Sequence, residues 1–365
     1  MITIEKNLDF QETYPLSHIG KPEELLFFDI ETTGFSGQSS YLYLIGCIWF
    51  SKGRWQLIQW FADTLQAESE ILHTFFRFLK NFRTIIHFNG DGFDIPFLTK
   101  RCQALSLPYD FSCVQSLDIY KKIRPYRRIL GLESLKQKAI EHFLGIHRTD
   151  TCTGGQLIQV YLDYLNSHDH SLYQLLLLHN EDDLKGMPTI LPVLCYPDFL
   201  ENPFTLLSCE LSSHSPVLEK TEESLILNCS SPYTVPISFS SVSEHISGFS
   251  LHGKGNRLFL SIPLFTGTLR HFFPNYRDYY YLIFEDTAVH KSVGEYVDRA
   301  ARRQATASTC YIKKEGCFLP QFESIFSPEL KKEKRDKLSY AEYQEGIFDD
   351  KKRLNQYIKH IIAHF

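Results

Sequence analysis

The stretch LLFFDIETTG at residues 25–34 decides the fold of the first half of the chain. A short apolar run that ends in Thr-Thr-Gly predicts a buried strand. Asp29 and Glu31 are two residues apart in this run, so both carboxylates project from one face of the strand near its end. Two neighbouring like charges favour a cation between them, and hard divalent ions such as Mg²⁺ prefer oxygen ligands. Two solvated acids at a strand end are the alternative for this motif alone.

The segments around this stretch predict an α/β domain over residues 1–195. Further strands are expected at 41–50, 55–61 and 84–88. Helices are expected at 68–82, 132–144, 155–165 and 171–190. This order of elements is typical of a mixed sheet flanked by helices, with antiparallel strands at its start.

The second half of the chain has a different character. Residues 196–222 are rich in Pro, Ser and Glu and are interpreted as a linker. Short β-type runs follow, and they predict a smaller α+β domain of unknown role over 223–365. Within this domain we expect a helix over 288–306, a hairpin over 311–318 and a charged helix over 339–363.

Composition limits the class of protein without deciding it. A chain of 365 residues with 43% hydrophobic residues is long enough for two globular domains. The net charge of −5 leaves nucleic-acid binding to local basic patches. Nine cysteines without a Cys-x-x-Cys spacing favour a reducing compartment. The sequence shows no signal peptide and no apolar run near the ~20 residues of a membrane span, so we expect a cytoplasmic protein without a membrane partner.

Two further acidic motifs follow the first. NGDGFD at 89–94 comes directly after a predicted strand, and Asp94 opens a helical stretch as either an N-cap or a metal ligand. HNEDD at 179–183 comes after four leucines and places His179 and Asp183 four residues apart, on one face of a helix. A simple helical ion pair is the alternative for this last motif.

The DEDD superfamily of exonucleases has three motifs that this chain resembles in order: FDIETTG at 28–34, NGDGFD at 89–94 and HNEDD at 179–183. The superfamily consists of ribonuclease-H-like 3′–5′ exonucleases and includes the proofreading domains of family B DNA polymerases. Residues 118–183 look most like the predicted bacterial ribonuclease-H-like exonucleases. The resemblance covers about residues 20–190.

This resemblance implies a ribonuclease-H-like fold and a two-metal nuclease. It assigns two Mg²⁺ or Mn²⁺ ions to four carboxylates: Asp29, Glu31, Asp94 and Asp183. Thr32 and Asn89 would place the terminal nucleotide. The expected partner is DNA or RNA with a single-stranded 3′ end, and protein partners are not indicated.

His179 departs from the pattern of the superfamily. One branch has a Tyr four residues before the last Asp, and the other has a His five residues before it. This chain has a His at the four-residue spacing. Because an imidazole has an ordinary pKa of roughly 6.5, it can orient or deprotonate an attacking water. We therefore expect a catalytic role for His179.

The expected contacts to the substrate backbone lie in KKIRPYRR at residues 121–128. The candidate phosphate-binding cations are Lys121, Lys122, Arg127 and Arg128. Further cations follow at Lys136, Lys138 and Arg148. A solvated basic surface is the alternative for this patch. Asp118 is interpreted as a turn or capping residue rather than a fifth acid of the site.

Three functional hypotheses follow from these residues. The first is a metal-dependent nuclease, expected to be a 3′–5′ exonuclease. The second is a nucleic-acid-binding module that has this fold and little or no turnover. The third is an endonuclease that uses the same site, because the carboxylates do not determine where along a strand cleavage occurs.

Overall fold

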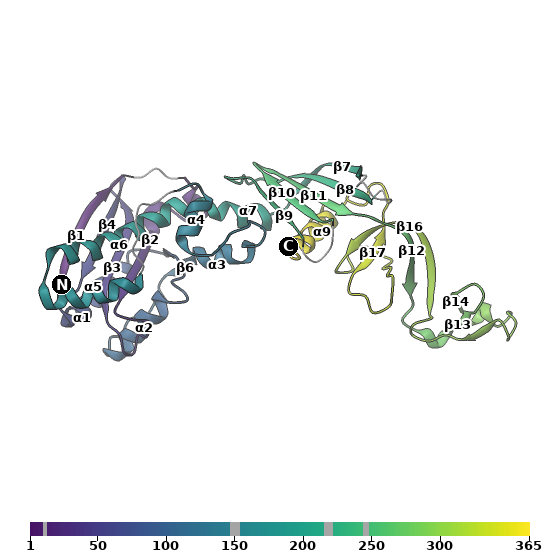
Figure 1. Ribbon diagram of the computed structural model, residues 1–365, viewed down its shortest axis with the longest axis horizontal. Coiled ribbons are helices and arrows are strands. Elements are labelled where there is room, and N and C mark those ends of the chain that lie inside the picture. Colours follow the sequence, from purple (N-terminus) through teal and green to yellow (C-terminus); the bar gives the residue numbers. More distant parts are fainter. Residues whose placement is uncertain (10–12, 147–153, 215–221, 244–247) are drawn as a thin grey trace. The chain divides into compact units, whose positions relative to one another are not determined.

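The computed structural model describes residues 1–9, 13–146, 154–214, 222–243 and 248–365 (Figure 1). The chain forms two compact units. Unit 1 consists of Met1–Arg127 and Leu132–Pro197, and unit 2 consists of Arg128–Gly131 and Asp198–Phe365. No helix in the described ranges is long and apolar enough to cross a membrane. The cysteines in those ranges are free thiols.

Unit 1 is built on a six-stranded sheet in the order β1-β4-β3-β2-β5-β6. Its strands are β1 (Ile2–Leu8), β2 (Leu25–Thr32), β3 (Leu42–Ser51), β4 (Arg54–Phe61), β5 (Thr84–His87) and β6 (Gln115–Asp118). β2, β5 and β6 are parallel, and the first four strands pair antiparallel. The predicted mixed sheet is confirmed. The edge strands β1 and β6 were not predicted, because the first is mostly polar and the second has only four residues.

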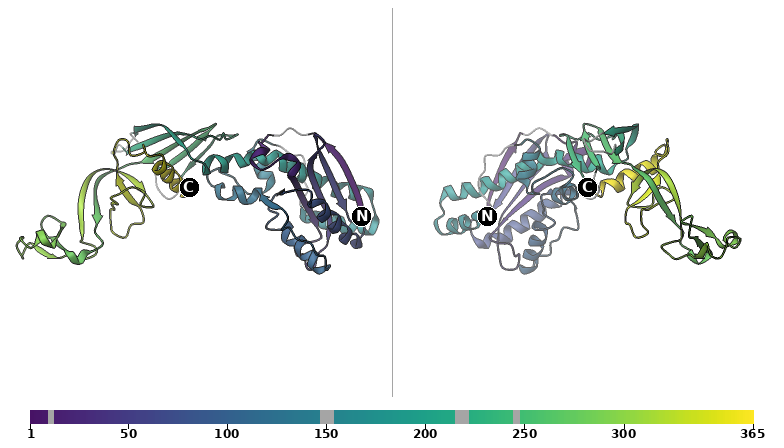
Figure 2. Two further views of the ribbon diagram at one scale, coloured as in Figure 1. Left: turned by 180° about the vertical axis from the view of Figure 1, so that it is seen from behind. Right: turned by 45° about the vertical axis from the view of Figure 1, so that its right-hand side comes forward.

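The helices of unit 1 are α1 (Glu68–Leu79), α2 (Asp94–Ala104), α3 (Ile119–Ile123), α4 (Gln137–Phe143), α5 (Gly154–Ser167) and α6 (His170–Ile190). Helix α7 (Cys195–Glu201) begins in unit 1 and ends in unit 2. Neighbouring residues of a strand point to opposite faces of the sheet. Phe28 of β2 packs on Phe75 of α1, whereas Asp29 accepts a hydrogen bond from Asn180 of α6. Helices α1 and α6 therefore cover opposite faces, and the view from behind in Figure 2 shows the strands in front of α5 and α6.

A glycine of β3 allows α6 to lie close to the sheet. A Cβ atom at Gly46 would overlap the side chains of Asn180 and Leu184 on α6. Gly46 is also the residue of β3 that pairs with Asp29 of β2. The close approach of helix and sheet thus occurs at the position of the first candidate carboxylate.

Unit 2 is rich in β-structure. One sheet has five strands in the order β7-β8-β11-β10-β9, and two others have three strands each, in the orders β12-β16-β17 and β14-β13-β15. The strands are β7 (Thr205–His214), β8 (Glu222–Ser230), β9 (Phe239–Val242), β10 (Ser250–Lys254), β11 (Arg257–Pro263), β12 (Phe265–Phe272), β13 (Tyr279–Leu282), β14 (Thr287–His290), β15 (Arg302–Gln304), β16 (Tyr311–Gln321) and β17 (Ser339–Glu342). The helices are α8 (Lys291–Gly294) and α9 (Lys351–Ile362).

Four details of the second half differ from the sequence-based expectations. The segment interpreted as a linker, 196–222, contains most of α7 and all of β7, and β7 pairs with β8 along its length. A helix was expected over 288–306, but within that range only α8 is helical. The strands β14 and β15 pair with the Tyr-rich β13 instead. The expected hairpin over 311–318 is one continuous strand, since β16 pairs with β12 throughout that range. The expected helix over 339–363 begins as strand β17, and its helical part is only α9. Strand pairing with distant segments overrode the local patterns in these cases.

Candidate metal and active site

Asp29 and Glu31 lie near the end of β2, on the sheet face that α6 covers. Asn180 Nδ2 donates a hydrogen bond to Asp29 Oδ2 over 2.9 Å. The Glu31 side chain is 11% exposed, and the Tyr43 hydroxyl lies 3.5 Å from its Oε2. The two-residue spacing therefore places both carboxylates on one face of the sheet, where α6 supplies their neighbours.

Asp94 reaches the same region from α2. It is the first residue of that helix rather than its N-cap, a position that Phe93 occupies, and it is 6% exposed. The backbone amide of Ile30, between Asp29 and Glu31 on β2, interacts with the Asp94 carboxylate and lowers its pKa in part. The short connection after β5 thus brings the third carboxylate to the end of β2.

Helix α6 supplies His179 and Asp183, which are one helical turn apart. His179 Nε2 lies 3.4 Å from Asp183 Oδ2 and 3.8 Å from Glu31 Oε1. The imidazole is buried, with 7% of the residue exposed, and the Asp183 side chain is 29% exposed. One ligand atom from each of Glu31, His179 and Asp183 lies within 4.8 Å of the other two.

Burial raises the pKa of three of these carboxylates. The pKa of Asp29 lies well above its ordinary value, that of Glu31 is raised to about 8 and that of Asp94 to about 7. Repulsion adds to burial, chiefly from Asp94 on Asp29 and from Asp183 on Glu31. Within the described ranges, no Lys or Arg side chain is paired with these three carboxylates. Buried oxygen donors that repel one another form a donor set that suits a hard divalent cation.

A chain of buried amides fixes the orientation of Asp29. Gln59 Nε2 on β4 donates to Asn180 Oδ1 over 2.9 Å, so the other end of the Asn180 amide, Nδ2, faces Asp29. Gln59 and Asn180 are both fully buried, and Gln59 also donates to the Leu177 carbonyl. Asn180 lies within the motif HNEDD, but the sequence alone predicted no role for it. Gln59 is a polar residue within an apolar strand, and this pattern could have predicted that its side chain is buried with a hydrogen-bond partner.

A small cavity of about 150 Å³ adjoins Glu31. It is lined by Ile30, Glu31, Thr32, Gly34, Phe35, Phe93, Gly155 and Ile158. Phe35 is 85% exposed, and its ring lies edge-on to that of Phe93, with the centroids 6.2 Å apart. The cavity therefore offers apolar ring surfaces beside the carboxylate site.

The two residues expected to place a nucleotide lie at the borders of this site. Thr32 lines the cavity, and its hydroxyl donates to the Gly34 carbonyl over 2.8 Å. Asn89 is exposed, and its backbone is left-handed, with φ 61°. Its backbone N–H donates a hydrogen bond to Asp118 Oδ1. Thr32 is thus held by a hydrogen bond at the end of β2, and Asn89 by one in the connection between β5 and α2.

The four candidate cations all lie on exposed positions in or after α3. Lys121 Nζ lies 2.6 Å from Asp91 Oδ2, so its charge is paired within the protein. Arg127 donates to the carbonyls of Leu132 and Glu133. Lys122 and Arg128 are exposed as well, and Arg148 lies outside the described residues.

A second cluster in unit 1 also combines a histidine with two acids, His87, Asp91 and Asp118. Its polar groups are satisfied by one another and by the backbone. Asp118 caps α3, as expected, by accepting from the Lys121 amide N–H, and it also accepts from the Asp91 amide N–H. Ser116 bridges His87 and Asp91 through hydrogen bonds of 2.8 and 2.5 Å. Although burial raises the pKa of Asp91, hydrogen bonds from Lys121 and Ser116 lower it below its ordinary value.

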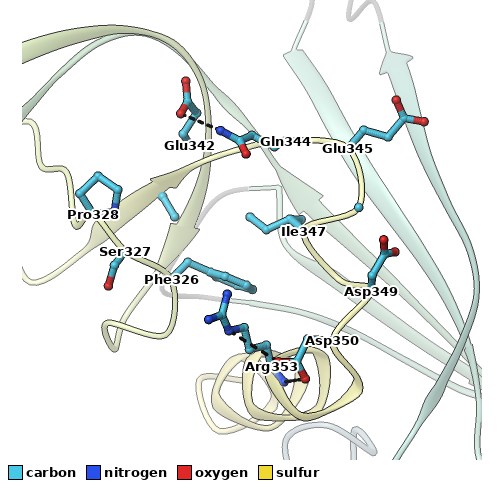
Figure 3. Close-up of a pocket in the computed structure, with 12 residues that line it drawn as sticks. Phe326, Ser327, Pro328, Glu342, Gln344, Glu345, Ile347, Asp349, Asp350 and Arg353 are labelled. Carbon is cyan, nitrogen blue, oxygen red and sulfur yellow. Dashed lines mark hydrogen bonds and ion pairs between the residues drawn. The ribbon is translucent and has the colours of Figure 1, made fainter.

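Unit 2 contains a larger cavity of about 430 Å³ beside the start of α9 (Figure 3). Four acids and Arg353 are among its lining residues, which also include Phe326 and Ile347; the acids are Glu342, Glu345, Asp349 and Asp350. Glu342 is paired with Lys314 and Gln344. Asp350 caps α9 through two backbone N–H groups. Glu342 and Asp350 therefore stabilise the neighbouring strand and helix, and their contacts give no sign of a ligand.

Comparison with known proteins identifies the class of unit 1. Residues 26–195 match the family model RNase_H_2, described as RNase_H superfamily. This part of the chain is therefore a ribonuclease-H-like domain, in agreement with the sheet topology and with the resemblance to DEDD exonucleases. No curated protein matches the chain.

Several solved structures are similar at low sequence identity. A family B DNA polymerase from Pyrobaculum calidifontis is 16% identical, with a TM-score of 0.39, and the match covers 49% of this chain and 26% of that one. The E. coli ExoI–ssDNA complex is 11% identical, with a TM-score of 0.31 and coverage of 56% and 54%. An exonuclease I from Methylocaldum szegediense is 16% identical, with a TM-score of 0.28 and coverage of 37% and 40%. The chain thus spans about half or less of the length of each structure.

Proposed function

We propose that the ribonuclease-H-like domain is a metal-dependent nuclease that removes nucleotides from the 3′ end of a DNA or RNA strand. The observation that carries this proposal is the convergence of Asp29, Glu31 and Asp94, all buried and with raised pKa values, at one end of β2. Asp183 completes the set from α6 and adds to their repulsion. Such a cluster is costly for the fold by itself and is favoured at a site that neutralises it with cations.

The donor set fits two divalent ions. Asp29, whose carboxylate is repelled by both Asp94 and Glu31, would contact both ions. Glu31 and Asp183 would hold the ion on the nucleophile side, and Asp94 would hold the other. Bound Mg²⁺ or Mn²⁺ supplies charge neutralisation at the phosphate and lowers the pKa of a bound water. The Gln59–Asn180 pair orients the Asp29 carboxylate, and the His179 imidazole lies beside Glu31 and Asp183 as a further catalytic group.

The chain also provides surfaces for the substrate. Phe35 and Phe93 would stack on the terminal base in the cavity beside Glu31, where Thr32 and Asn89 would place the nucleotide. Lys122, Arg127 and Arg128 would contact the backbone of the strand, together with Lys121 once its pairing with Asp91 is exchanged for a phosphate.

The test is cleavage of 5′-labelled single- and double-stranded DNA and RNA by the full chain, with Mg²⁺, with Mn²⁺ and with a chelator. Asp29→Ala and Asp183→Ala serve as the inactive comparisons. A metal-dependent ladder that shortens from the 3′ end is the expected result. Cleavage of circular or 3′-blocked strands would make the enzyme an endonuclease. Binding without cleavage under every metal condition would contradict the proposal and favour a binding module.

A further inference from the structure

Unit 2 contains a small sheet that is inserted at the end of a two-stranded ladder. β12 ends at Phe272 and β16 begins at Tyr311, and these two residues pair with each other. The chain between them, residues 273–310, forms the three-stranded sheet β14-β13-β15 and the short α8. Its core is a small cluster of buried side chains, among them Tyr281 and Ala288. We call residues 273–310 the tip sheet, and they belong to a different unit from the carboxylate site.

Strand pairing in the tip sheet places arginines of β15 beside tyrosines of β13. The Arg303 guanidinium lies 4.9 Å from the centroid of the Tyr281 ring. The Arg302 guanidinium lies 4.6 Å from the centroid of the Tyr280 ring. Because neighbouring residues of a strand point to opposite faces, each face of the sheet carries one such pair. A guanidinium group over a ring forms a favourable cation–π pair, and its planar form also stacks on nucleobases.

Two aromatic rings of the tip sheet are almost fully exposed. Phe284, in the turn after β13, is 81% exposed, and Tyr296, after α8, is 91% exposed. The Ile283 N–H donates to the Ala301 carbonyl over 2.9 Å, so the turn with Phe284 lies beside the segment that contains the exposed Arg299. Both rings thus leave their faces open to a stacking partner, and a cation lies on the segment next to one of them.

We propose that the tip sheet binds single-stranded nucleic acid, with bases stacked on Phe284 and Tyr296 and backbone phosphates held by Arg299 and Arg303. Proteins that bind single strands with little sequence preference combine aromatic stacking platforms with a positively charged path for the backbone. Residues 299–303, Arg-Ala-Ala-Arg-Arg, supply three positive charges and no acid. This inference rests on the proposed function, because the bound strand is the substrate that the ribonuclease-H-like domain would shorten.

The acids of the tip sheet leave these arginines available. Asp286 accepts hydrogen bonds from the hydroxyls of Tyr281 and Tyr311 and forms an ion pair with Lys313. Asp298 accepts from the backbone N–H of Ala300 over 2.8 Å. The remaining acids of the tip sheet include Glu285 and Glu295, which are exposed. In the part of the chain that the structure describes, no ion pair joins the arginines of 299–303 to an acid.

Fluorescence anisotropy of labelled oligothymidylate and oligouridylate tests the surface, with the full chain in chelator to prevent metal-dependent cleavage. The double variant Phe284→Ala/Tyr296→Ala should bind at least roughly 10-fold more weakly than the wild type, because two stacked bases lose their platforms. Arg299→Ala should lower the slope of log affinity against log salt by about 0.7, the value for one phosphate contact on a single strand. The controls are Val242→Ala, an exposed apolar residue of β9, and Arg257→Ala, an exposed arginine of β11, and both should bind as the wild type does.

Photocrosslinking locates the contact in the wild-type protein without any substitution. Strands that contain iodouracil crosslink to aromatic side chains that stack on it, and mass spectrometry should find these crosslinks at Phe284 or Tyr296. Crosslinks confined to unit 1, with unchanged affinity in the double variant, would overturn this inference and leave the nuclease proposal standing. Crosslinks at the tip sheet without metal-dependent cleavage would support the binding surface and overturn the nuclease proposal. Polyglutamate that displaces the strand from the tip sheet at equal concentration would overturn the inference in favour of an acidic protein partner.

Discussion

Unit 1 contains two clusters of one histidine and two acids, and they are electrostatic opposites. In the cluster of His87, Asp91 and Asp118, hydrogen bonds from Lys121 and Ser116 lower the pKa of Asp91 below its ordinary value. In the cluster of Glu31, His179 and Asp183, burial and repulsion raise the pKa of Glu31 to about 8. The same residue types thus favour the ionised carboxylate of Asp91 in one place and the protonated carboxyl of Glu31 in the other.

The difference teaches that residue types alone do not define a metal site. The first cluster accepts backbone N–H groups from the loop between β5 and α2 and therefore holds the turn that positions Asp94. In the second cluster, the Glu31 carboxylate lies 3.5 Å from the Tyr43 hydroxyl, and burial and repulsion from Asp183 raise its pKa. The carboxylates of the first cluster already have hydrogen-bond donors, so a cation from solution would add little to them. In the second cluster, a cation would neutralise carboxylates that repel one another.

Removal of one of the carboxylates with a raised pKa should have the largest effect. We expect Asp29→Ala to reduce metal-dependent cleavage by at least about 10³-fold, since a lost ligand removes several kcal/mol of charge stabilisation. Single-turnover cleavage of a 5′-labelled strand is the measurement. Asp91→Ala, in the satisfied cluster, is the matched control and should retain most of the activity. Equal losses in the two variants would remove the distinction between the clusters.

The stability of the metal-free protein should depend on pH through the same carboxylates. Their folded pKa values, about 8 for Glu31 and about 7 for Asp94, lie above the ordinary values of 4.5 and 3.8. A group with a raised folded pKa stabilises the fold below its unfolded pKa, and this contribution is lost as the pH rises through the folded pKa. We therefore expect the unfolding temperature to fall between about pH 5 and pH 8, a loss on the order of a few kcal/mol.

Thermal unfolding with chelator and with excess Mg²⁺ measures this effect. Divalent ions bind the folded state with its carboxylates ionised, so they should restore most of the lost stability at the alkaline end. Glu31→Gln should flatten the pH dependence without metal. A stability that rises with pH over this range would show that the carboxylates are already neutralised by the protein.

The buried amides should have an intermediate effect. We expect Asn180→Ala to weaken metal affinity by roughly 10–100-fold, as is usual when a group that orients a ligand is lost. The Asp29 carboxylate would lose the donor that fixes its orientation. Isothermal titration with Mn²⁺ is the measurement, and Asn166→Ala, an exposed asparagine of α5, is the control. If Asn180→Ala binds Mn²⁺ with unchanged affinity, Asn180 does not orient a metal ligand and contributes only to packing.

The fold of unit 1 was largely predictable because its signals are local. The apolar run with Asp29 and Glu31 predicted a strand with two carboxylates on one face, and the mixed sheet followed from the order of the elements. The roles of Gly46, Gln59 and Asn180 depend on strand pairing and helix packing between segments far apart in the sequence. Spacing within a single motif carries no information about such partners.

Unit 2 was less predictable for a related reason. Its strands pair with distant segments, so the local pattern of 311–318 suggested a turn where β12 completes a continuous ladder with β16. Likewise, a helix was expected over 288–306, whereas Arg302 in that range lies on β15 with its guanidinium over the ring of Tyr280 in the neighbouring strand. Tertiary pairing decided these conformations, and a single sequence gives little access to it.

The smallest expected effect concerns the cation that distinguishes the two clusters. Lys121 Nζ is paired with Asp91, but its side chain is 60% exposed, so solvent screens the pair and Lys121→Ala should change stability little. The variant should also leave Mn²⁺ affinity within about 3-fold of wild type, because backbone N–H groups and Ser116 still satisfy the second cluster. Chemical denaturation and Mn²⁺ titration of the two proteins measure both quantities. A new Mn²⁺ site in Lys121→Ala would mean that one ammonium group alone separates a structural cluster from a metal site. If Lys121→Ala binds as many Mn²⁺ ions as the wild type, the backbone N–H groups around Asp118 are what distinguishes the two clusters.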